Sequence, residues 1–92
     1  MVHYNITIKG KVQGVYFRAS ALKRARDLSL AGTVKNEFDG SVFIEVEGNK
    51  NQIEPFLKWC YVGPTLSKVT EVKITQSSLK NYKEFKILET EN

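Results

Sequence analysis

The sequence contains one cysteine and one histidine, and these scarcities exclude several kinds of site. Cys60 cannot form an internal disulfide, so the sequence predicts a reducing, cytoplasmic compartment. His3 lies far from Cys60 along the chain, and neither residue has neighbours at metal-ligand spacing. We therefore expect neither a disulfide framework nor a metal centre.

Long apolar segments are also missing. No run approaches the roughly 20 residues that cross a bilayer, and the N-terminus enters an alternating pattern instead of a signal peptide. The 92 residues, 41% of them hydrophobic, suit a single domain over residues 1–92 with one modest core. The net charge of +4 favours an anionic partner but does not distinguish a small phosphate from a nucleic acid or a membrane.

Hydrophobic periodicity predicts the order of the secondary-structure elements. Expected strands cover residues 2–8, 33–38, 42–47 and 68–75, with a short final strand around 85–87, and expected helices cover 17–30 and roughly 51–61. Asp39-Gly40 is a strong hairpin signal between the second and third strands. This order predicts an α+β, ferredoxin-like split βαβ fold (βαββαβ plus a short terminal strand), with two helices on one face of a mostly antiparallel sheet.

Three local expectations follow from the same patterns. Asn51 with Glu54 forms a possible capping box for the second helix, and Asn49 is the alternative cap. Cys60 falls in the apolar stripe of that helix, which indicates a core residue and not a nucleophile. His3 alternates out of the apolar face of the first strand, which predicts a surface position.

The segment Gly10-Lys11-Val12-Gln13-Gly14-Val15-Tyr16-Phe17-Arg18 joins the first strand to the first helix. Such a turn can direct backbone N–H groups into one concavity that binds an anion, and the helix N-terminus adds favourable partial charge. Arg18 would add a planar fork of donors that suits a phosphate. The same residues also suit an ordinary strand-to-helix turn, and the Walker pattern G-x-x-x-x-G-K-[ST] is absent from the sequence.

Two further residues have open interpretations. Asn36 comes late in an expected strand, next to the hairpin, where its amide could orient a water molecule or could satisfy backbone groups. Tyr16 lies inside the glycine turn, where it could line the mouth of a site or cap the core.

Both segments resemble signatures of the acylphosphatase family. Residues 10–18 resemble G-x-V-Q-G-V-x-F-R and match it at every fixed position. The second signature, G-aromatic-[AVC]-x-N-x-x-x-G-x-V with a more distant glycine, is matched by Gly32, Val34, Asn36, Gly40, Val42 and Gly48. Thr33 stands where that family has an aromatic residue, which we interpret as altered packing. Gly63-Pro64 and Val69 resemble the family's later Gly-Pro-x-x-Ala-x-Val connection, with Ser67 in place of alanine.

The resemblance implies hydrolysis of the carboxyl–phosphate bond of acyl phosphates. It implies that Arg18 grips the phosphate, that Asn36 positions the attacking water, and that no cofactor, metal or covalent enzyme intermediate takes part. The phosphate would also be bound by the backbone N–H groups of Gln13, Gly14, Val15, Tyr16, Phe17 and Arg18. Expected partners are the small acyl phosphate and inorganic phosphate, as product and competitive inhibitor, for a monomer that uses neither nucleic acid nor membrane.

Two other function classes share some of these features. One is a non-catalytic ferredoxin-like module that binds an anion or a protein without turnover. The other is an RNA-binding module of the RRM type, which needs paired aromatic residues on the exposed face of the central strands. The third strand offers Phe43 between Ser41 and Glu45, and the RNP1 pattern is absent from the sequence.

Overall fold

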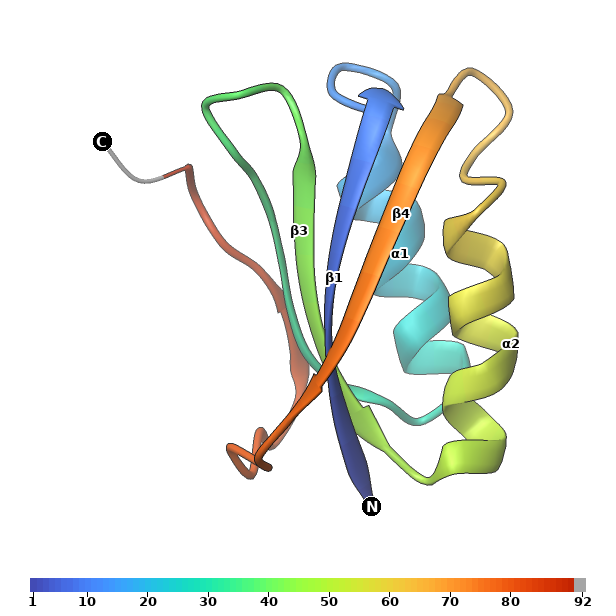
Figure 1. Cartoon of the computed structure of the whole chain (residues 1–92). Helices are drawn as coiled ribbons and strands as arrows, with labels where there is room; N and C mark the ends of the chain where they lie inside the picture. The colour runs from blue at the N-terminus through green and yellow to red at the C-terminus, as the bar shows by residue number, and fades with distance from the viewer. Residues whose placement is uncertain (91–92) are drawn as a thin grey trace.

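A five-stranded sheet carries both helices on one of its faces (Figure 1). The computed structural model describes residues 1–90. The elements in chain order are β1 (Val2–Lys11), α1 (Phe17–Asp27), β2 (Ala31–Asn36), β3 (Val42–Gly48), α2 (Lys50–Cys60), β4 (Lys68–Ser77) and β5 (Phe85–Ile87). The predicted order of elements is therefore confirmed.

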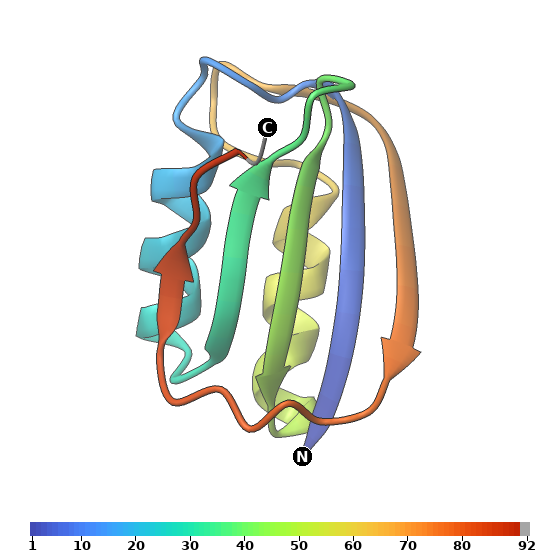
Figure 2. The same ribbon diagram turned by 90° about the vertical axis from the view of Figure 1, so that its left-hand side faces the viewer.

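The strand order across the sheet is β4-β1-β3-β2-β5 (Figure 2). β1 lies in the interior and pairs antiparallel with both β3 and β4, while β2 pairs antiparallel with β3. β5 pairs with the outer edge of β2 in the parallel direction. The predicted ferredoxin-like arrangement, with its short terminal strand, is the arrangement observed.

The core fills the space between the sheet and the two helices. Every second residue of the central strands faces the helices, so that Ile6 pairs with Ile44 and Ile8 with Val42 in the buried layer. An aromatic cluster completes this layer. Trp59 lies 5.1 Å from Phe17 and 5.8 Å from Phe56 between ring centroids, and Phe56 lies 6.1 Å from Phe85. Cys60 is fully buried here, as predicted, and burial raises the pKa of its thiol to about 12.

The second helix begins earlier than the capping-box interpretation predicts. Asn49 is its N-cap, and the backbone carbonyl of Asn49 accepts from the N–H groups of Gln52 and Ile53. The side chain of Asn49 makes no capping hydrogen bond, so the cap is set by the backbone alone. Pro55 consequently lies inside α2, where it cannot donate to the carbonyl four residues earlier.

The segment 78–84, which we call the strap, corrects the prediction for His3. It runs from β4 to β5 across the lower end of the sheet face that carries no helix (Figure 2). His3 does point to that face, but it is fully buried, because Tyr82 of the strap stacks over it with ring centroids 6.1 Å apart. The surface position predicted for His3 is therefore wrong, since strand alternation carries no information about a distant covering segment.

Candidate active site

The loop 12–16 joins β1 to α1 at one edge of the sheet, where the hairpin 37–41 also lies (Figure 1). Two of its residues have left-handed backbone conformations, Gly14 with φ 74° and Tyr16 with φ 66°. A left-handed tyrosine is uncommon, because its Cβ crowds the backbone, and this one is the N-cap of α1. Alternate left-handed residues curve the chain into a concave backbone, the form that binds anions.

The loop leaves its backbone N–H groups without an acceptor in the described part of the chain. Within residues 1–90, none of the hydrogen bonds is donated by a backbone N–H of residues 13–18. The loop is nevertheless anchored, because the side chains of Val12 and Val15 are buried. A fixed loop with several free N–H groups at a helix N-terminus can bind a phosphate without rearrangement.

Arg18 extends from the first turn of α1 beside these donors. Its side chain is half-buried and lines a cleft of about 400 Å³, together with Val12, Gly14, Tyr16, Phe17, Ala19 and Ile87. Within the described part of the chain, no carboxylate forms an ion pair with Arg18. Its guanidinium is therefore available for an external anion.

Asn36 ends β2 at the same edge of the sheet as the loop 12–16 (Figure 2). Its side-chain oxygen Oδ1 is buried and has no hydrogen-bond partner among residues 1–90. A buried amide oxygen without a partner is costly, so such an atom suits a water molecule or a substrate. Asn36 does not line the cleft that contains Arg18.

The side chain of Gln13 links the loop to the hairpin, and sequence reasoning missed this role. Its Nε2 donates to the backbone carbonyl of Glu37 at 2.7 Å and to that of Ser41 at 2.9 Å. The hairpin is itself braced, since the hydroxyl and then the backbone N–H of Ser41 donate to Asp39 and lower the pKa of that carboxyl. The sequence offered no signal for the link, because neither partner is a side chain.

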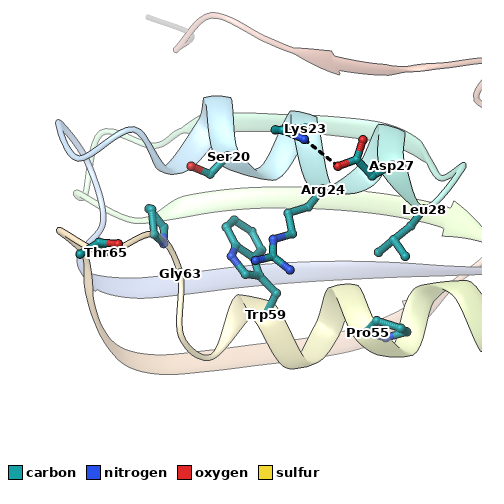
Figure 3. Close-up of a pocket in the computed structure, with 10 residues that line it drawn as sticks. Ser20, Lys23, Arg24, Asp27, Leu28, Pro55, Trp59, Gly63 and Thr65 are labelled. Carbon is teal, nitrogen blue, oxygen red and sulfur yellow. Dashed lines mark hydrogen bonds and ion pairs between the residues drawn. The ribbon is translucent and has the colours of Figure 1, made fainter.

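A second, larger cleft of about 560 Å³ lies between α1 and α2 (Figure 3). The guanidinium of Arg24 lies 5.6 Å from the ring centroid of Trp59, and Lys23 pairs with Asp27 at 2.9 Å. None of the predicted site residues lines this cleft. The predicted site residues therefore lie only at the end of the sheet that carries the loop 12–16.

Residues 1–90 contain no group of three or more histidine, cysteine or acidic side chains arranged to hold a metal. Over the same residues, neither helix is long and apolar enough to cross a membrane.

Known proteins share this arrangement over nearly the whole chain. The sequence model of the Acylphosphatase family matches residues 4–87. An acylphosphatase of Methylococcus capsulatus is 36% identical over 89 residues, which cover 96% of this chain and 97% of that protein. The crystal structure of acylphosphatase from Bacillus subtilis superposes with a TM-score of 0.93 at 40% identity, covering 96% of this chain and 99% of that one. An acylphosphatase structure from Coxiella burnetii gives 0.91 at 33% identity, covering 95% and 92%. This chain therefore belongs to the acylphosphatase family.

Proposed function

We propose that this chain, acting as one acylphosphatase-like domain, hydrolyses acyl phosphates to a carboxylate and inorganic phosphate. The observation that carries the proposal is the anchored loop whose backbone N–H groups, from Gln13 to Arg18, have no protein acceptor within residues 1–90. Membership of the acylphosphatase family supports the same reaction.

The phosphoryl group binds in the concavity of the loop. The N–H groups of residues 13–18 donate to its oxygens, and the guanidinium of Arg18 donates to two of them in a bidentate contact. In phosphoryl transfer, charge accumulates on these oxygens, so fixed donors stabilise the transition state more than they stabilise the substrate.

Asn36 positions the attacking water through its unpartnered Oδ1, which accepts a hydrogen bond from that water. The water oxygen forms a bond to phosphorus as the bond between phosphorus and the acyl oxygen breaks. The carboxylate leaves without protonation because it is a good leaving group. The water's proton passes to an oxygen of the phosphate itself, so no enzyme base is required.

The reaction needs no cofactor, metal or covalent enzyme intermediate, because position and charge neutralisation suffice. A buried, single cysteine suits a reducing cytoplasm. We propose a monomer that uses neither nucleic acid nor membrane.

The test is a phosphate-release assay on purified protein with benzoyl phosphate and acetyl phosphate. Both should be hydrolysed far above their spontaneous rates. An ordinary phosphate monoester such as p-nitrophenyl phosphate should react much more slowly, because its leaving group is poorer. Binding of phosphate without turnover of any acyl phosphate would make the protein an anion-binding module instead.

A further inference from the structure

We propose that the cleft between the loop 12–16 and β5 binds the acyl group, and that Ile87 and Tyr16 select bulky apolar acyl groups. The inference rests on the proposed function, since it takes the phosphoryl group to lie beside Arg18. It adds that β5, through Ile87, forms a wall of the cleft that determines which acyl groups bind.

The cleft combines one cation with apolar side chains. Arg18 is the charged residue among those that line it, and the remaining lining residues carry no ionisable group except the phenol of Tyr16. An acyl phosphate has the same division, with its charge on the phosphoryl group and an acyl tail that offers no donors. The volume of about 400 Å³ falls within the range of small-molecule sites, so a tail of aromatic size fits beside the phosphate.

Tyr16 and Ile87 expose apolar surface at this place. Tyr16 is 75% exposed, so it lines the mouth of the cleft and does not cap the core. Ile87 is 40% exposed although its strand is paired with β2. Apolar side chains held beside Arg18 gain by covering an apolar ligand, because the covered area leaves water.

The wall that carries Ile87 is fixed, although it lies near the end of the chain. Ile87 is in register with Val34 of β2, and the N–H of Leu88 donates to the carbonyl of Val34 at 2.8 Å. At the other end of the strand, the N–H of Gly32 donates to the carbonyl of Glu84 at 3.0 Å, and Phe85 is buried in the core. A fixed wall can discriminate between tails by size, whereas a mobile one would adapt to either.

The experiment compares kcat/KM for benzoyl phosphate and acetyl phosphate in the wild type and in Ile87→Ala. Truncation should lower the value for benzoyl phosphate roughly three- to tenfold, as expected for lost apolar contact in a partly open site. Acetyl phosphate should change less than about twofold, and the inhibition constant of inorganic phosphate should stay the same. Leu79→Ala is the matched control, because Leu79 is 43% exposed and lies on the strap, outside the cleft.

A second variant guards against an effect on folding. Tyr16→Asn removes the ring but keeps a residue that tolerates the left-handed backbone, so it should also lower benzoyl phosphate turnover more than acetyl phosphate turnover. Equal losses for both substrates, or an unchanged ratio in both variants, would overturn the acyl assignment alone. Failure of the wild type to hydrolyse either substrate would instead overturn the proposed function.

Discussion

The Nδ1 atom of His3 lies 2.7 Å from Oε2 of Glu47, across the β1–β3 pair, and both side chains are buried. The same carboxylate accepts from the backbone N–H groups of Lys80 and Tyr82, so it fastens the strap to the sheet. Glu45 adds an ion pair with Lys80 at 2.6 Å. These contacts hold the segment that leads into β5.

The first prediction concerns acid stability. Burial disfavours the charged carboxylate of Glu47, but hydrogen bonds from the N–H of Lys80, the ring of His3 and the N–H of Tyr82 outweigh it and lower its pKa below the ordinary 4.5. The charged form therefore stabilises the fold fully above about pH 4.5, and this stabilisation is lost as the pH falls through the lowered value. Thermal midpoints measured between pH 7 and pH 3 should fall steeply in the wild type.

Glu47→Gln should lower the free energy of unfolding at pH 7 by about 1 to 3 kcal/mol, because it replaces one oxygen that accepts from buried N–H groups by an amide nitrogen that cannot accept. Its midpoint should depend less on pH in the acid range. Glu54→Gln, at an exposed position of α2, is the control and should follow the wild type. An acid transition of the same steepness in Glu47→Gln would remove this carboxylate from the explanation.

The second prediction concerns the link made by Gln13. Gln13→Ala removes two hydrogen bonds to the hairpin and should cost about 1 to 2 kcal/mol of stability. It should also lower kcat/KM about tenfold, because the loop 12–16 is no longer tied to the hairpin that directly follows Asn36. Gln76→Ala, at an exposed position of β4, serves as control. Lost stability with unchanged kinetics would show that the link is structural only.

The third prediction concerns the grip on the phosphate. Arg18→Lys keeps the positive charge but loses the planar fork, so activity should fall about a hundredfold. Arg26→Lys, on the same helix but outside the cleft, should retain activity. Near wild-type turnover in Arg18→Lys would mean that charge alone is needed.

The fourth prediction concerns water positioning. Asn36→Ala should lower kcat about a hundredfold, because the nucleophile is no longer aligned with phosphorus. The inhibition constant of inorganic phosphate and the thermal midpoint should change little, with Asn51→Ala on α2 as control. Much weaker phosphate inhibition in a folded variant would move Asn36 into the phosphate site.

The fifth prediction concerns inhibitors. Inorganic phosphate should compete with benzoyl phosphate, since both use the same N–H groups. EDTA should leave the initial rate unchanged. If EDTA abolished the activity and a divalent metal restored it, the metal-free mechanism would be contradicted.

Local sequence signals predicted most of the fold. The alternation in β1, the hairpin at Asp39-Gly40 and the glycine turn before Arg18 are each determined by neighbouring residues. The loop edge that carries Gln13–Arg18 and Asn36 follows from the strand order once these elements are in place. The roles assigned to these residues remain predictions.

What the sequence could not predict depends on contacts between distant segments. The burial of His3 requires a strap some 80 residues along the chain, and strand alternation reports only on the strand itself. The amide of Gln13 donates to backbone carbonyls, and because every residue has one, the sequence does not show which of them accept. The contribution of Ile87 to the cleft likewise appears only when β5 is placed beside β2.

The position of β1 between β3 and β4 has a consequence for how the chain folds. β4 pairs with β1 from His3–Ser77 to Lys11–Lys68, so these contacts join segments that are far apart in the sequence. The chain loses the conformational entropy of closing this long loop before the strand pairing can stabilise the fold. Where the pairing of β1 with β4 shifts register between Lys9 and Gly10, the backbone of Gly10 lies so close to the carbonyl of Lys68 that a Cβ there would clash. Folding should therefore be slow for a chain of this size, and the loop 12–16 should reach its final shape only after β4 has joined the sheet.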